Sequence, residues 1–162
     1  MKTIYYKEKP ITDFTKTALI KLGISNESDE LGVSDVDRII ADHLQYQKDD
    51  IQEQLDTLKS VKYKKLYEDI EVSGNVYQAD ITSQLNISNT IADYESLATD
   101  SDITDMFSDS KIEWTLADNT NVQLTLDELK AIRLAINKRR ALIHIKYNKD
   151  KAVLKAKMEA LK

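Results

Sequence analysis

The chain of 162 residues has 41% hydrophobic and 31% charged residues, three glycines, one proline and a formal net charge of −5. This length allows one compact domain or a small domain with a helical extension, and the shortage of helix breakers favours long solvated helices over sandwiches or barrels. The absence of cysteine excludes disulfides and thiolate metal sites.

The charged residues are unevenly distributed. Residues 130–162 hold eleven Lys or Arg against two acidic residues, a net charge of +9, whereas residues 78–128 hold eleven acidic residues and one lysine, a net charge of −10. Either the two parts neutralise one another in the fold, or the basic part offers a surface to an acidic partner. Nucleic acid is the least favoured partner, because no aromatic-studded basic strand or zinc-finger pattern accompanies the charge.

Short elements are predicted at the start of the chain. Residues 2–6 are β-prone and predict an edge strand or arm that ends at Pro10. Thr12 is a candidate cap for a short helix that runs to Gly23, and the polar residues 24–33 predict a loop. The first ten residues lack the apolar run of a signal peptide, and no stretch of the chain reaches the ~20 apolar residues of a membrane span. We therefore expect neither export by a signal sequence nor membrane insertion.

A long helix is predicted over about residues 35–69. Ser34 has the chemistry of an N-cap, acidic residues follow it, and no Gly or Pro occurs before Gly74. The apolar positions recur at spacings of three, four or seven, which gives a narrow stripe typical of a coiled coil or a helical hairpin. Another part of the same chain or a second copy can cover such a stripe. It consists of Val36, Ile40, Leu44, Ile51, Leu55, Leu58 and Leu66.

Two hairpins and a middle helix are predicted next. The turn 73–75 separates two short β-prone runs, and residues 80–97 return to helical spacing with Asp80 as a candidate cap. Residues 99–110 predict an acidic loop or a short helical turn. Residues 111–124 then predict a second hairpin, in which Trp114 has core packing as the default role and an interface anchor as the alternative.

A second long helix is predicted from residue 125 to the C terminus, because Thr125 and Glu128 have the spacing of a capping box. The expected class is α+β: two long helices flank a small antiparallel sheet of hairpins plus a middle helix, with a coiled-coil-like N-terminal part. We expect an N-terminal arm and helical region over 1–69 and a small α+β domain with a long basic helix over 70–162. The apolar stripe of the second helix is Leu129, Ile132, Ile136, Ile143, Tyr147, Leu154, Met158 and Leu161.

The sequence offers little for catalysis. His43 and His144 stand outside any zinc-hydrolase pattern, and no glycine-rich phosphate loop or nucleophile motif occurs. A calcium loop would need glycine and glutamate where Asp105 and Lys111 stand. We therefore expect no enzyme, no cofactor and no metal. The acidic cluster considered for calcium is Asp100, Asp102, Asp105 and Asp109.

Several short motifs follow one another in residues 71–162. These are Gly74-Asn75, Tyr77, Ala79-Asp80, Ser83-Gln84-x-Asn86-Ile87, Trp114 with Asp118-Asn119, and Leu124-Thr125 with Glu128-Leu129. In this order they resemble a domain of unknown function common in phage and prophage tail-region proteins, whose genes often lie near tail-fibre genes. The resemblance implies a tail component or a tail-fibre assembly factor, and it carries over no catalytic residue.

We therefore predict a phage tail-associated structural or tail-fibre assembly protein that acts by protein–protein binding. A monomer must pair its two narrow stripes or leave them exposed, so we expect a homo-oligomer and a tail or fibre protein as partner, in the host cytoplasm during assembly or in the virion tail. The alternative is a small acidic phage-encoded inhibitor of a host defence nuclease, which the acidic segment suggests. An enzyme acting on cell-wall sugar would need paired carboxylates that the sequence does not place. The predicted interface residues are Ile40, Leu44, Ile51, Leu55, Leu58, Trp114, Ile143, Tyr147 and Leu154.

Overall fold

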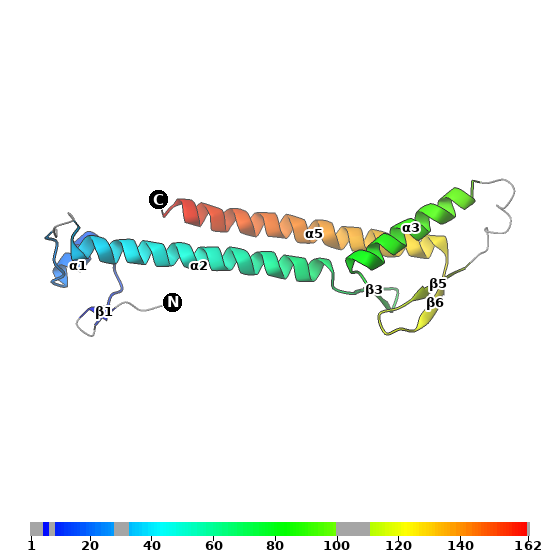
Figure 1. The fold of residues 1–162 in the computed structure, drawn as a ribbon, viewed down its shortest axis with the longest axis horizontal. Helices are drawn as coiled ribbons and strands as arrows, with labels where there is room; N and C mark the ends of the chain where they lie inside the picture. Colours follow the sequence, from blue (N-terminus) through cyan, green and yellow to red (C-terminus); the bar gives the residue numbers. More distant parts are fainter. Residues whose placement is uncertain (1–4, 7–8, 28–32, 100–110, 162) are drawn as a thin grey trace. The chain divides into compact units, whose positions relative to one another are not determined.

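The computed structural model describes residues 5–6, 9–27, 33–99 and 111–161. Helices and short antiparallel hairpins make up the described chain (Figure 1), which confirms the predicted α+β class with two long helices. The elements are β1 (Tyr5–Tyr6), β2 (Lys9–Pro10), α1 (Lys16–Lys21), α2 (Asp35–Leu66), β3 (Ile70–Val72), β4 (Asn75–Tyr77), α3 (Ile81–Leu97), β5 (Ile112–Thr115), β6 (Asn121–Leu124) and α5 (Leu126–Glu159).

The chain divides into two compact units. One comprises residues 1–56 and 153–162, and the other comprises residues 57–152. We call them the terminal unit and the central unit. Both long helices contribute to both units. None of the described helices combines the length and the apolar character that a membrane span requires.

A small apolar core anchors the terminal unit, where α1 packs against the start of α2. Its buried residues are Ile11, Leu19, Ile24 and Val36.

The predicted cap of α1 was wrong. Thr15, not Thr12, caps this helix: its hydroxyl accepts a hydrogen bond from the backbone N–H of Ala18 at 3.3 Å. Ile11 is buried in the core, and the Asp13 carboxylate accepts a hydrogen bond from the Thr15 backbone, so the chain turns before the helix starts.

The long helix α2 begins where the sequence predicts. The Ser34 hydroxyl accepts a hydrogen bond from the backbone N–H of Asp37 at 3.2 Å, which is the expected capping contact. The helix ends at Leu66, three residues before the predicted end at residue 69. The carbonyls of Glu68 and Asp69, just beyond it, accept hydrogen bonds from the guanidinium of Arg139. A tertiary contact therefore stabilises the chain at this point.

Two hairpins of the central unit confirm the predicted turns. In the β3–β4 hairpin, the two loop residues Ser73 and Gly74 have positive φ angles of 52° and 83°, the conformation that two-residue hairpin loops require. In the β5–β6 hairpin, Trp114 pairs with Val122. The backbone N–H of Ala117 donates to the carbonyl of Val76 at 3.0 Å and links the two hairpins.

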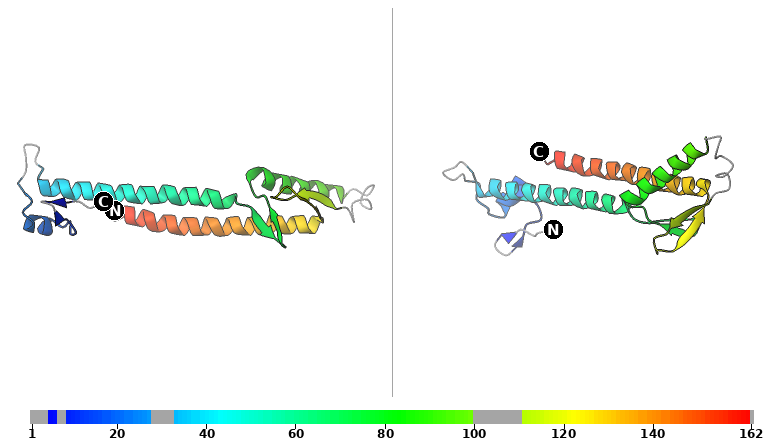
Figure 2. Two further views of the ribbon diagram at one scale, coloured as in Figure 1. Left: turned by 90° about the horizontal axis from the view of Figure 1, so that it is seen from below. Right: turned by 45° about the vertical axis from the view of Figure 1, so that its right-hand side comes forward.

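The core of the central unit lies between these hairpins, α3 and the first turns of α5, which gather together in both figures (Figures 1 and 2). The predicted capping box of α5 is confirmed, since the Thr125 N–H donates to the Glu128 carboxylate at 2.7 Å and the Glu128 N–H donates to the Thr125 hydroxyl at 3.2 Å. The buried residues are Tyr77, Ala79, Ile87, Ile91, Ile112, Leu116, Leu124, Leu129, Ile132 and Ile136.

The middle helix α3 has its predicted cap but a different buried face. Asp80 accepts a hydrogen bond from the backbone N–H of Ser83 at 2.9 Å. Ile81 and Leu85, which the spacing places with the apolar positions, are 58% and 56% exposed. The buried face instead runs through Ser83, Ile87 and Ile91, which recur every four residues and face the core.

Candidate protein-binding surface

Within the central unit, the end of α2 runs antiparallel to α5. The Lys62 ammonium lies 4.4 Å from the centroid of the Tyr147 ring, and Arg139 reaches the carbonyls of Glu68 and Asp69. Residues further along the chain at the end of α2 therefore contact residues nearer the start of α5. Within the central unit, part of the α2 stripe therefore lies against another part of the same chain.

The covering is incomplete and leaves a groove of about 320 Å³ between the two helices. Its apolar residues are half-buried or exposed, and Leu142 is 68% exposed. We call it the α2–α5 groove. It is lined by Leu58, Val61, Lys62, Lys65, Leu142, Ile143, Lys146, Tyr147 and Asp150.

The rim of the α2–α5 groove is positively charged. Three lysines and one aspartate line it. The Lys62 ammonium lies over the Tyr147 ring, and the Lys151 ammonium lies 5.5 Å from the centroid of the same ring. Lysine side chains rest their methylene stems on apolar surface and keep the ammonium in water. The groove thus combines an apolar floor with a basic rim.

Three of the predicted interface residues meet in this groove: Leu58, Ile143 and Tyr147. The sequence analysis missed Val61 and Leu142, because each lies just off the stripe of its helix. Trp114 is half-buried and packs against the core of the central unit, in line with its default role.

The other predicted interface residues belong to the terminal unit. Ile40 packs against its core, and Ile51 is buried beside a hollow that Leu161 also lines. The remaining three are half-buried: Leu44, Leu55 and Leu154.

The histidines and acidic clusters carry no assembled chemistry in the described part of the chain. His43 stacks on Phe14 with a centroid distance of 3.6 Å, and His144 is exposed. No group of three or more His, Asp or Glu side chains in residues 5–6, 9–27, 33–99 and 111–161 is arranged to hold a metal. The acidic cluster considered for calcium lies at residues 100–109, outside the described residues.

Several acidic residues of the segment 78–128 serve local structure. The pKa of Asp80 is lowered by hydrogen bonds from the backbone and side chain of Ser83, and the pKa of Glu128 is lowered in the same way by Thr125. The pKa of Asp118 is lowered by hydrogen bonds from Thr120. These carboxylates cap helices or hold a hairpin turn, so part of the negative charge has a structural explanation.

A comparison with known families places the groove in a wider context. A family described as a domain of unknown function (DUF4376) matches residues 49–161, more than half of the chain. The chain belongs to this family. No curated protein and no solved structure matches it. The DUF4376 region begins inside α2, earlier than the stretch 71–162 that carries the resemblance noted above, and it therefore contains every residue of the α2–α5 groove.

Proposed function

We propose that this DUF4376 protein acts by binding other proteins, as a phage tail-associated structural protein or a tail-fibre assembly protein. The observation that carries protein binding is the α2–α5 groove, with its exposed Leu142 and its basic rim. The phage context rests on the resemblance of residues 71–162. The proposed location is the host cytoplasm during assembly or the virion tail.

The energetic argument concerns apolar side chains that folding leaves in water. Full burial of a leucine side chain is worth about 1.5–3 kcal/mol relative to exposure. Leu142 is 68% exposed and Val61 is 44% exposed, and they lie in one groove. A partner that fills the groove gains most of that free energy from two neighbouring residues, while the lysines at the rim stay partly hydrated.

Self-association is the first form of binding that we propose. A second copy could cover the groove, and light scattering on the purified protein measures the molar mass directly. We expect an oligomer for the wild type and a lower mass for Leu142→Glu, because burying the new carboxylate is costly. Lys149→Glu, which makes a change of the same sign outside the groove, is the control. A wild-type monomer at every concentration would remove the oligomer from the proposal.

A tail or fibre protein is the second expected partner. The protein is captured through an affinity tag from cells that express it from its natural gene, and the bound proteins are identified by mass spectrometry. We expect tail or fibre proteins with the wild type and with Lys149→Glu, and their loss with Leu142→Glu. Mass spectrometry of purified particles decides between the two locations. If tail and fibre proteins are absent from the wild-type capture, the proposed function is wrong.

The same capture tests the alternative, an acidic inhibitor of a host defence nuclease. Its support is the net charge of −10 over residues 78–128. The capping roles of Asp80, Asp118 and Glu128 weaken that support, because these carboxylates are engaged within the chain. A host nuclease in the wild-type capture would favour the inhibitor.

A further inference from the structure

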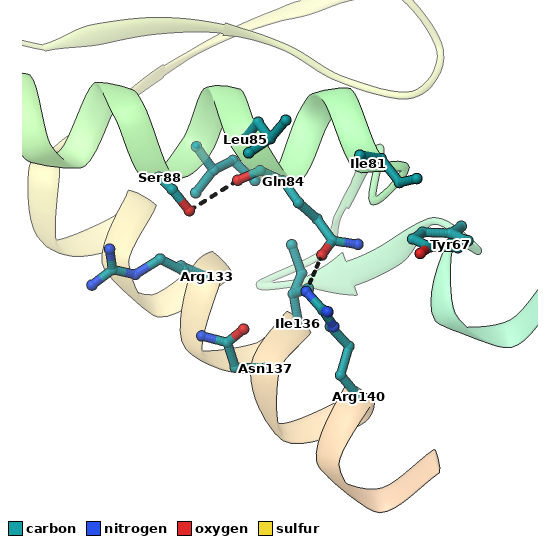
Figure 3. Close-up of a pocket in the computed structure, with 10 residues that line it drawn as sticks. Tyr67, Ile81, Gln84, Leu85, Ser88, Arg133, Ile136, Asn137 and Arg140 are labelled. Atoms are coloured by element: carbon teal, nitrogen blue, oxygen red, sulfur yellow. Dashed lines mark hydrogen bonds between the residues drawn. The ribbon is translucent and has the colours of Figure 1, made fainter. Parts of the chain in front are cut away.

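A second cavity of the central unit lies between α3 and α5 and has a different chemistry from the groove. Its volume is about 250 Å³, and side chains of both helices point into it (Figure 3). None of the described residues that line it is acidic. We call it the α3–α5 cleft; its lining residues are Tyr67, Ile81, Gln84, Leu85, Ile87, Ser88, Arg133, Ile136, Asn137 and Arg140.

Gln84 holds one wall of the cleft in place. Its side-chain amide nitrogen donates to the carbonyl of Ala79 at 2.6 Å, and its amide oxygen accepts a hydrogen bond from Arg140 at 2.6 Å. This contact uses one of the five N–H donors of the Arg140 guanidinium. The arginine is thus oriented by the fold, and donors remain for a ligand.

Arg133 provides a second cation on the same side of α5. It lies seven residues before Arg140, which is about 10 Å along a helix axis. It forms no hydrogen bond with the residues that the structure describes. The nearby Glu95 forms an ion pair with Lys130 at 2.8 Å, which is the main reason for its lowered pKa, and the charge of Arg133 lowers that pKa further. Asn137 lies between the two arginines and places a side-chain amide between them (Figure 3).

The opposite wall, on α3, adds exposed apolar side chains beside Gln84 and Ser88. Ile81 and Leu85 are 58% and 56% exposed, and both line the cleft. Both stand at the helical spacing of the apolar positions of α3, and the fold leaves them exposed. Two arginines, one of them oriented by Gln84, therefore line the cleft together with two exposed aliphatic side chains.

We propose that the α3–α5 cleft binds an acidic segment of a partner protein, in which two carboxylates three residues apart flank an apolar side chain. A segment in the polyproline II conformation advances about 3.1 Å per residue with three residues per turn, so two side chains three residues apart lie on one face and span roughly the distance between Arg133 and Arg140. Guanidinium groups bind carboxylates through paired, charge-assisted hydrogen bonds. The apolar side chain contacts Ile81 and Leu85. This inference rests on the proposed protein-binding role and names a second surface for it.

The size and the lining of the cleft favour a peptide over other ligands. Pockets for drug-sized molecules measure about 300–1,000 Å³, so a cavity of about 250 Å³ suits anchoring side chains better. Single-stranded nucleic acid requires aromatic platforms for its bases, whereas Tyr67 is the one aromatic residue among the described residues that line the cleft.

The first experiment uses a fluorescein-labelled peptide with the core Glu-Leu-Ala-Glu between Gly-Ser flanks, and measures fluorescence anisotropy with the full chain. Replacing both Glu by Gln is expected to weaken binding at least about tenfold, because two charge-assisted contacts are lost. Replacing Leu by Ser is expected to weaken it less, by about threefold or more. Absence of binding by the Glu-Leu-Ala-Glu peptide up to about 1 mM would overturn the proposal.

Matched variants locate the binding site. Arg133→Gln is expected to weaken peptide binding about tenfold, and Lys138→Gln, which removes the same charge from an exposed position outside the cleft, less than about twofold. Leu85→Ser is compared with Leu134→Ser, since Leu134 is 54% exposed and lies outside the cleft. Circular dichroism checks that each variant keeps its helices. Equal effects of Arg133→Gln and Lys138→Gln would reduce the binding to general charge attraction and sink the proposal.

Two further experiments distinguish this inference from nucleic-acid binding in the cleft and from the proposed function of the α2–α5 groove. An oligo-dT strand that displaces the peptide and loses affinity with Arg133→Gln would assign the cleft to phosphates and overturn the peptide proposal. Leu142→Glu is expected to bind the peptide like the wild type, because Leu142 lies outside the cleft. If the peptide fails to bind while tail proteins are still captured, only this inference fails. If the peptide binds but tail proteins are never captured, the proposed phage role fails and the cleft chemistry stands.

Discussion

The first turns of α5 and the turns that follow carry the same apolar stripe but are buried differently. Leu129, Ile132 and Ile136 are fully buried, whereas Ile143 and Tyr147, on the same face, are half-buried. The difference arises because α3 and both hairpins pack around the first turns, while the end of α2 packs along the later ones. One helix therefore belongs to a core at its start and offers a binding surface further on.

The largest expected effect separates these two regions by stability. Ile132→Ala is expected to lower the free energy of unfolding by about 3 kcal/mol, because it leaves a cavity in a closed core. Leu142→Ala removes a comparable side chain from an exposed position and is expected to change stability by less than about 0.5 kcal/mol. Urea denaturation followed by circular dichroism measures both. Equal losses would show that the later turns are as tightly packed as the first.

Arg139 lies at the junction of the two regions and gives the next effect. Its guanidinium donates to the carbonyls of Glu68 and Asp69, and burial lowers its pKa while the charges of those two residues raise it. Arg139→Met is expected to cost about 1–2 kcal/mol, because hydrogen bonds from a charged donor are lost. Lys138→Met, at an exposed neighbouring position, is the control for the same urea titration. A stability as high as that of the control would mean that the antiparallel pairing does not depend on this contact.

Asp80, at the start of α3, tests the region in which α3 and both hairpins pack around the first turns of α5; we call it the covered region. Asp80→Ala removes the cap that binds the backbone N–H of Ser83 and is expected to cost about 1 kcal/mol. Asp80→Asn keeps an acceptor and should cost little, since asparagine is an equally good cap. Thermal denaturation of both variants makes the comparison. A similar loss in the two would assign the effect to the charge of Asp80 and not to the cap.

Local chemistry allowed much of the fold to be predicted. The caps at Ser34, Asp80 and Thr125 depend on side chains that bond to the backbone three residues away, so a short stretch of sequence contains the whole interaction. The side chains of Thr12 and Thr15 do not distinguish the two positions, because both carry a hydroxyl that can cap a helix. The burial of Ile11, which decides between them, depends on residues distant in the sequence.

The binding surface was harder to predict for the same reason. The stripe positions Leu58, Ile143 and Tyr147 follow from helical spacing, but Val61 and Leu142 lie beside the stripes and join the groove only once the two helices pair. The antiparallel direction depends on contacts such as that of Arg139, for which spacing gives no signal. In the same way, Ile81 and Leu85 fit a core face by spacing, and only the position of α3 leaves them exposed.

The smallest expected effect is the response of the covered region to acid. The pKa values of Asp80 and Glu128 are lowered from 3.8 and 4.5, chiefly by backbone hydrogen bonds from Ser83 and Thr125. A lowered pKa means that the stabilisation is complete above the unfolded-state value and is lost as the pH falls through the folded-state value. Stability should therefore decline below about pH 4.5, modestly, because both carboxylates are solvent-exposed.

Asp80→Asn sharpens this last test, because the asparagine caps α3 without titrating. Its urea midpoint should fall less steeply than that of the wild type between about pH 5 and pH 2. Leu142→Ala should follow the wild-type slope, because it leaves the capping carboxylates in place. The fluorescence of Trp114, which packs against the covered core, reports the transition where the caps act. If Asp80→Asn and the wild type lose stability in parallel, the capping carboxylate is not the source of acid sensitivity, and the covered region owes its stability to apolar packing instead.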